Sequence, residues 1–122
     1  MIYGIGTDLV KPSRITRSLE KYGERFARRL LSEWEWEDYI NNNQPAMFLA
    51  KRFAAKEALS KAMGTGLRYP VTLTNIAIAH DSLGRPYFEF HPELATLIKS
   101  AGIIHHHLSI SDELNLATAF VI

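Results

Sequence analysis

The sequence of 122 residues contains no cysteine. Disulfide bonds and thiolate chemistry are therefore excluded, and the composition suits a reducing compartment. The chain also has no apolar run long enough to span a bilayer, and its start, MIYGIGTDLV, lacks the basic residues and the cleavage site of a secretory signal. From these absences we expect a cytoplasmic protein with no membrane partner.

A large excess of charge is also missing, since the formal net charge is only +1. The distribution is nevertheless uneven, because residues 11–29 contain seven basic and two acidic residues, a local charge of +5 that leaves −4 for the rest of the chain. Such a segment is either a solvated helical face or a surface for an acidic partner, which could be nucleic acid, a membrane surface or an acidic protein.

The length and a hydrophobic content of 47% predict one globular domain over residues 1–122. The residue pattern predicts a strand that ends at Asp8, then helices, a hairpin around DSLG, a further helix and a second pair of strands. The helices are expected at 13–23, 24–32, 33–42, 46–63 and 92–102, and the later strands at 71–80, 85–90, 105–112 and 116–122. Ser32 and Glu35 have the spacing of a capping box for the third helix. This order indicates an α+β fold in which an antiparallel sheet packs around a long central helix.

The long helix expected at 46–63 is apolar on nearly every side, yet it contains Arg52, Lys56, Glu57 and Lys61. On a helical wheel Glu57 and Lys61 lie ~40° apart among small residues, whereas the other two project elsewhere. Small neighbours around a charged pair leave room for a groove, and the apolar turns nearby predict that the pair is partly buried. The alternative is an ordinary i, i+4 ion pair on the surface, which stabilises a helix by only ~0.2–0.5 kcal/mol.

A glycine-containing loop follows this helix directly. Gly64, Thr65 and Gly66 come one turn after Lys61, and glycines let backbone N–H groups approach a bound anion closely. The segment is therefore a candidate phosphate cradle, and the alternative is an ordinary helix C-cap.

Two carboxylates are candidate metal ligands. Asp8 and Glu57 would supply hard oxygen donors, and Mg²⁺ is commonly held by one or two carboxylates together with substrate phosphates. Because 49 positions separate the two residues, only the fold can bring them together.

Three motifs carry a resemblance to a known family. GIGTDLV near the start, FAAKEALSKAMGTG in the middle and HLS near the end, together with GRPYFEF and ATAFVI, resemble the holo-[acyl-carrier-protein] synthases, the small bacterial 4′-phosphopantetheinyl transferases. The resemblance covers essentially the whole chain. It implies the 4′-phosphopantetheinyl transferase fold and transfer of the phosphopantetheine arm of coenzyme A to a serine of apo-acyl carrier protein, with release of adenosine 3′,5′-bisphosphate.

The resemblance also implies roles around the reacting groups. Asp8 and Glu57 would hold Mg²⁺ against the pyrophosphate, Lys61 would contact its oxygens, and these three residues would be catalytic. Either Glu57 or a metal-bound water held by Asp8 would take the serine proton. The implied contacts with coenzyme A are Lys61, Gly64, Thr65, Gly66, Pro86, His107 and Ser109. A zinc site in the run of three histidines at 105–107 is not expected, because adjacent strand residues point to opposite faces.

The same resemblance implies a homotrimer, in which Asp8, Glu57 and Lys61 would face His107 and Ser109 across a subunit interface. The basic segment would then dock the acidic carrier protein through Arg14, Arg17, Lys21, Arg25 and Arg28. The competing hypothesis is a small nucleic-acid-binding module that uses residues 11–29. It does not account for the two carboxylates, and aromatic residues for base stacking are sparse there, so we expect no nucleic-acid partner.

Overall fold

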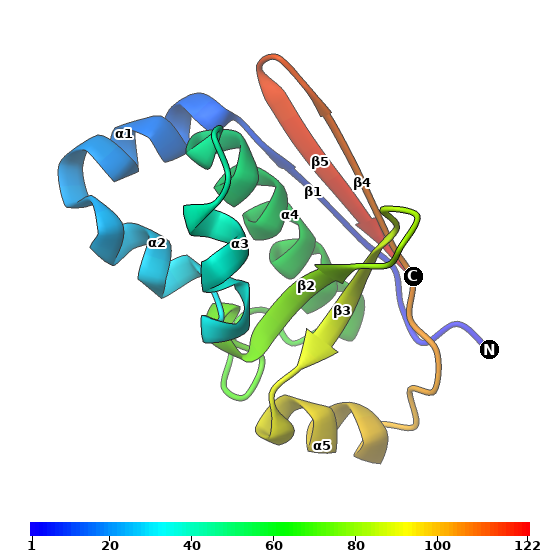
Figure 1. Cartoon of the computed structure of the whole chain (residues 1–122). Coiled ribbons are helices and arrows are strands. Elements are labelled where there is room, and N and C mark those ends of the chain that lie inside the picture. Colours follow the sequence, from blue (N-terminus) through cyan, green and yellow to red (C-terminus); the bar gives the residue numbers. More distant parts are fainter.

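Helix α4 (Pro45–Met63) is the longest element of the computed structural model, which describes all residues 1–122. It runs between a three-stranded sheet and a layer of shorter helices (Figure 1). The other helices are α1 (Pro12–Tyr22), α2 (Glu24–Leu30), α3 (Trp36–Ile40) and α5 (Pro92–Ser100), with short 3₁₀ turns η1 (Glu33–Glu35) and η2 (Leu73–Asn75). None of the helices is long and apolar enough to cross a membrane.

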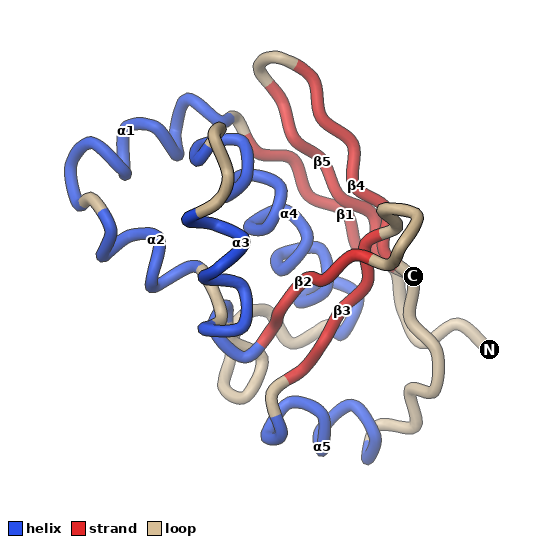
Figure 2. Tube along the Cα trace, viewed as in Figure 1, coloured by secondary structure: helices blue, strands red, loops and turns tan.

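The strands form two antiparallel sheets (Figure 2). The first has the order β1-β5-β4, and the second pairs β2 with β3. The strands are β1 (Gly6–Val10), β2 (Ile76–His80), β3 (Pro86–Phe90), β4 (Leu108–Glu113) and β5 (Leu116–Val121). The predicted α+β fold with antiparallel sheet around a long helix is confirmed, and so are the hairpin around DSLG and the pairing of the last two strands.

Several boundaries differ from the sequence prediction, and the helix expected at 33–42 is instead η1 followed by the short helix α3. Asp8 lies in the middle of β1 rather than at its end. Residues 71–75 are not strand, because the side chain of Thr72 accepts a hydrogen bond from the N–H of Asn75 and closes η2. The histidines at 105–107 precede β4, although His107 exchanges two backbone hydrogen bonds with Ile122.

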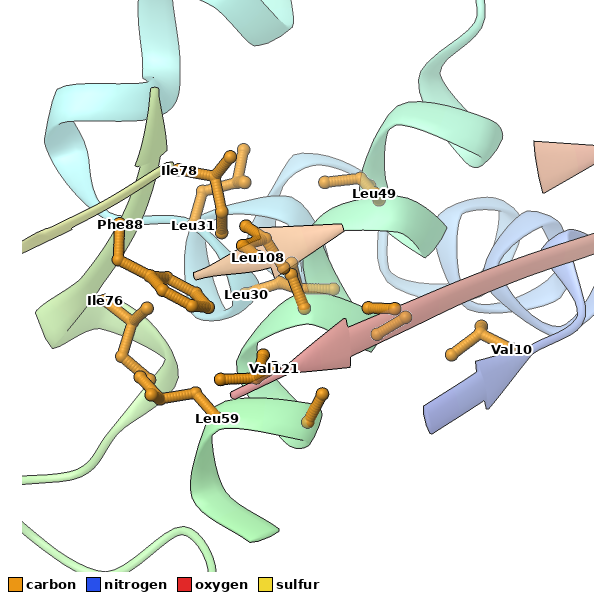
Figure 3. Packing of buried hydrophobic residues seen from close by; sticks show 14 of the residues in the cluster. Val10, Leu30, Leu31, Leu49, Leu59, Ile76, Ile78, Phe88, Leu108 and Val121 are labelled. Atoms are coloured by element: carbon orange, nitrogen blue, oxygen red, sulfur yellow. The ribbon is translucent and has the colours of Figure 1, made fainter. Parts of the chain in front are cut away.

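The hydrophobic core surrounds α4. Side chains from both sheets and from α1, α2 and α5 meet it, as Figure 3 shows for Leu30, Leu49, Ile78 and Val121. Ala50, Ala54, Ala55 and Ala58 of α4 are fully buried. Because these side chains are small, neighbouring backbone can approach the helix closely.

The charged residues buried in α4 are not the pair expected from the sequence. Arg52 and Lys56 are buried, whereas Glu57 is only partly buried and the side chain of Lys61 is 53% exposed. The expectation of a partly buried pair therefore holds for Glu57 and is wrong for Lys61. The physical reason is that a counter-ion reaches Arg52 and Lys56 from another element, the carboxylate of Glu35.

Candidate active site

The site begins where β1 crosses α4. An added Cβ at Gly6 would lie 1.8 Å from the carbonyl oxygen of Ala58, and one at Gly4 would lie 2.0 Å from that of Ala62. Only glycine permits so close an approach of strand to helix. Side chains alternate along a strand, so Asp8 lies on the same face of β1 as Gly6 and is directed at α4.

Asp8 meets Lys61 at this crossing. The Nζ atom of Lys61 donates to Oδ1 of Asp8 at 3.1 Å and to the backbone oxygen of Thr7 at 3.0 Å. The Asp8 side chain is 17% exposed, so the pair lies at the protein surface and is open to a ligand. The structure therefore joins two predicted site residues that are 53 positions apart.

Glu57 belongs to the same group. Partial burial raises the pKa of its carboxyl, the negative charge of Asp8 raises it further, and the Lys61 ammonium opposes both. The two carboxylates are oxygen donors of the kind that Mg²⁺ uses, whereas the ammonium cannot ligate a metal. No third histidine, cysteine or acidic residue completes a metal-binding group within the chain, so further ligands would come from water and substrate.

The glycine loop is a helix C-cap in this structure. Gly64 adopts a left-handed conformation (φ 75°) and donates its N–H to the carbonyl oxygen of Lys61. The N–H of Gly66 is bonded to the carbonyl oxygen of Ser60, whereas the N–H of Thr65 makes no backbone hydrogen bond. The loop therefore offers an anion the amide of Thr65, and not the two glycine amides that the sequence suggested.

Gly64 and Thr65 also line a hollow of about 380 Å³ together with Arg68 and Tyr69. The guanidinium of Arg68 adds a positive charge beside the loop. The sequence did not single out this residue, although a cation shortly after a glycine loop is a signal that could have identified it.

The residues expected at the nucleotide end lie elsewhere. Pro86 begins β3 and borders a hollow of about 660 Å³ that Lys51, Arg52 and His80 also line. None of Asp8, Glu57 or Lys61 lines this hollow. Burial lowers the pKa of His80, and the positive charges of Arg52 and Lys51 lower it further.

Ser109 and His107 also lie away from Asp8 within one chain. Ser109 is opposite Phe120 in the sheet, on the exposed face, whereas Asp8 is opposite the buried Ala119 on the face toward α4. His107 lines a separate hollow of about 490 Å³ beside the N-terminal residues. A single chain therefore does not bring these two residues to the carboxylates.

The predicted docking residues are exposed on α1 and α2. Arg14, Arg17 and Lys21 lie on α1, and Arg25 and Arg28 lie on α2. Arg28 differs from the others because it pairs with Glu24 at 2.8 Å and stacks over the ring of Trp36 at 3.9 Å. Part of its charge is therefore already compensated within the chain.

The sequence prediction missed the role of Glu35. Its capping box with Ser32 is confirmed, but the same carboxylate also binds Arg52 at 2.8 Å and Lys56 at 2.6 Å. Burial lowers the pKa of Lys56 from 10.5 to about 8, although Glu35 opposes this shift. Two cations spaced i, i+4 inside an apolar helix were the available signal, because buried charges need partners.

Comparisons with known proteins match the chain as a whole. The 4′-phosphopantetheinyl transferase superfamily matches residues 4–119. The holo-[acyl-carrier-protein] synthase of Nitrosospira multiformis is 73% identical over 122 residues, covering 100% of this chain and 98% of that protein. The crystal structure of the Neisseria meningitidis synthase has 48% identity and a TM-score of 0.97, covering 99% of this chain and 97% of that one.

A Bacillus anthracis holo-(acyl-carrier-protein) synthase has been solved in complex with CoA (3′,5′-ADP). It is 36% identical, has a TM-score of 0.81, and the match covers 99% of this chain and 95% of that one. Full-length similarity of both sequence and structure leaves no part of the fold unaccounted for. The chain belongs to the holo-[acyl-carrier-protein] synthase family within the 4′-phosphopantetheinyl transferase superfamily.

Proposed function

We propose that this chain transfers the 4′-phosphopantetheine arm of coenzyme A to a serine of apo-acyl carrier protein. The products are holo-acyl carrier protein and adenosine 3′,5′-bisphosphate. The observation that carries the proposal is the Asp8–Lys61 ion pair where β1 crosses α4, with Glu57 near enough for both charges to shift its pKa. The chain also matches this family over almost its whole length.

The two carboxylates fit a magnesium ion. The raised pKa of Glu57, caused in part by Asp8, shows that negative charge is concentrated here, and a divalent cation would relieve it. When bound, Mg²⁺ supplies charge neutralisation for the pyrophosphate. Asp8 and Glu57 would hold it, and either Glu57 or a water held by Asp8 would accept the proton of the serine.

Lys61 would bind the pyrophosphate oxygens. Its ammonium group is half exposed and its long side chain can turn from Asp8 toward a phosphate. Thr65, with its free amide, lies one turn beyond Lys61 and would bind the same group. Gly64 and Gly66, whose amides are already bonded, would border that group without a side chain in the way. These residues bind and orient the leaving group, which is most of what such a transfer requires.

The nucleotide end would be completed by another subunit. Ser109 and His107 cannot reach Asp8 within one chain, whereas in a homotrimer they would face it across an interface. The exposed face of the sheet that carries Ser109 also carries Leu9 and Phe120, which are 62% and 45% exposed. Apolar side chains on an open sheet face support such an interface.

Pro86 would border the adenosine. The hollow beside it is lined by Lys51 and Arg52, whose positive charges suit phosphate groups of the nucleotide. Asp38 and Asp112 line it as well, and Asp112 pairs with Lys51 at 3.8 Å, so Arg52 is the cation there that no carboxylate of the hollow pairs with. We further propose that residues 1–122 act as one domain in the cytoplasm, where both the carrier protein and coenzyme A would be available.

The basic surface would dock the acidic carrier. Arg14, Arg17 and Lys21 are exposed along α1, and Arg25 and Arg28 extend the surface onto α2. A nucleic-acid partner is not proposed, because the basic surface lies on an enzyme of the phosphopantetheine transfer family.

The direct test incubates the purified chain with coenzyme A, Mg²⁺ and apo-acyl carrier protein and weighs the carrier by mass spectrometry. We expect the carrier to gain the mass of one phosphopantetheine arm, and a carrier whose acceptor serine is replaced by alanine to gain nothing. Absence of any mass gain with a carrier that a known synthase modifies would refute the proposal.

A further inference from the structure

Glu35 lies where four N–H donors converge. Its side chain is 1% exposed. Oxygen Oε1 accepts from the backbone N–H of Ser32 at 2.9 Å and from Lys56 at 2.6 Å, and Oε2 accepts from Arg52 at 2.8 Å and from the backbone N–H of Ile78 at 3.1 Å. Every partner is a donor, so only an ionised carboxylate satisfies all four.

The two cations that share Glu35 differ in what else they contact. All three donors of Lys56 are used inside the protein, since Nζ also binds the carbonyl oxygens of Leu30 at 2.8 Å and Leu73 at 2.9 Å. Lys56 is fully buried and, unlike Arg52, does not line the 660 Å³ hollow beside Pro86. Its role is therefore to join α4 to α2 and η2.

Only one nitrogen of Arg52 makes hydrogen bonds within the protein. Its Nη1 atom binds Glu35 and the carbonyl oxygen of Ile78, and its guanidinium lies 4.3 Å from the centre of the Phe48 ring. Atoms Nε and Nη2 make no hydrogen bond, yet no buried side-chain nitrogen in the protein lacks a partner. The side chain of Arg52 is only 6% exposed, and it lines the 660 Å³ hollow that Pro86 borders.

Hydrogen bonds hold the Nη1 atom of Arg52, whereas Nε and Nη2 have no partner within the chain. The Phe48 ring sets the plane of the guanidinium, and Glu35 with the Ile78 carbonyl fixes its rotation within that plane. An arginine fixed in this way loses little side-chain entropy when it binds an anion.

We propose that Glu35 is a positioning residue for nucleotide binding, which directs the free N–H groups of Arg52 into the hollow beside Pro86 toward a phosphate of coenzyme A. The inference rests on the proposed function, because that function supplies the phosphate. Glu35 itself is buried and touches no substrate.

Simple electrostatics predicts the opposite effect. Removing a negative charge near an anion site raises the local positive potential, so an alanine at this position would strengthen binding if only charge mattered. The positioning role predicts weaker binding, because Arg52 would turn away from the hollow. Weaker binding by the variant would therefore support the positioning role, and tighter binding would support an effect of charge alone.

The experiment measures binding of adenosine 3′,5′-bisphosphate, the reaction product, by isothermal titration calorimetry at a temperature where every variant is folded. We expect Glu35→Ala to weaken binding about tenfold, equivalent to one charge-assisted hydrogen bond. Lys56→Met is the matched control, because it breaks the same buried cluster and leaves the Glu35–Arg52 pair in place. It should change the affinity less than about twofold.

Kinetics supply the second measurement. Glu35→Ala should raise the KM for coenzyme A while kcat per folded molecule stays close to that of the wild type, and Glu35→Asp should recover part of the loss. If Glu35→Ala does not fold, Glu35→Gln takes its place, since a neutral amide leaves two of the four donors without an acceptor.

Unchanged or tighter binding in the Glu35 variant would overturn the inference, and so would equal weakening in Lys56→Met, which would indicate a structural role only. Either result would leave the proposed function intact as long as the wild-type enzyme modifies the carrier. A wild type that binds no adenosine 3′,5′-bisphosphate and modifies no carrier would overturn both.

Discussion

Replacing Gly6 by alanine is expected to separate β1 from α4 and so to disrupt the candidate active site. The added Cβ would lie 1.8 Å from the carbonyl oxygen of Ala58 and 2.8 Å from the backbone N of Ala62, whereas ordinary contact begins at 3.4 Å. Both obstacles are backbone atoms of a helix, so they cannot rotate away. The strand must therefore retreat by about 1.6 Å, the difference between the two distances.

This retreat acts on the site through Asp8. The side chain of Asp8 lies two residues further along the same face of β1, and it is held to Lys61 at 3.1 Å. A retreat of about 1.6 Å would lengthen this contact beyond the range of a direct ion pair and would move one carboxylate away from Glu57. A 1 Å misplacement can cost about 10²-fold in rate.

Stability should fall at the same time. Overpacking costs about 1–3 kcal/mol, and for a chain of this size about 2 kcal/mol corresponds to a fall in Tm of roughly 5–10 °C. The assays are thermal unfolding followed by circular dichroism and carrier modification at a temperature well below both Tm values. The control is Ser111→Ala, which changes an exposed position in the same sheet. A Gly6→Ala protein with wild-type Tm and rate would refute the argument that the glycine is needed for close approach.

Further predictions concern the site, the docking surface and the buried cluster. Asp8→Ala should abolish transfer with little change in Tm, and in the metal-free protein Asp8→Asn should lower the pKa of Glu57, because Asp8 raises it; an unchanged Glu57 titration by carboxyl NMR would contradict their proximity. Arg14→Ala should raise the KM for the carrier more than Arg28→Ala does, since Glu24 already pairs with Arg28, and added salt should mimic both substitutions; carrier kinetics that ignore salt would exclude this docking surface. Lys56 has a pKa of about 8 when folded and 10.5 as its ordinary value, so between these values the unfolded state binds more protons and stability rises with pH. Relative to Lys56→Met, the wild-type free energy of unfolding should therefore rise by about 3 kcal/mol from pH 8 to 10.5, and parallel curves in urea titrations would show that Lys56 is not perturbed.

Much of the local structure follows from short-range signals. Helix α1 ends at Gly23 and α4 ends at Gly64, where positive φ angles suit glycine and end the helix. The hairpin of β2 and β3 forms around DSLG, in which Asp81 accepts from the N–H groups of Leu83 and Arg85. These features depend on residues within a few positions of one another, so the sequence shows them directly.

The candidate site was predicted in part. The resemblance identified Asp8, Glu57 and Lys61, and the wheel placed the last two on one face of α4. Neither the resemblance nor the wheel showed that Gly4 and Gly6 approach the backbone of α4. They also did not show that the amides of Gly64 and Gly66, in the loop after α4, are already bonded. The buried ion cluster was missed because its carboxylate, Glu35, comes from a different element and its local pattern indicated only a capping box.

The sequence alone predicted the family, the extent of α4 to within one residue and the residue types of the candidate site, because these depend on residue types and on periodicity within one segment. Only the tertiary structure decided that Asp8 binds Lys61, that Glu35 binds Arg52, and that Ser109 and Asp8 lie on opposite faces of the sheet. Such contacts join residues distant in sequence. They depend on which elements pack together and how closely, and periodicity within a single element carries no information about its partner.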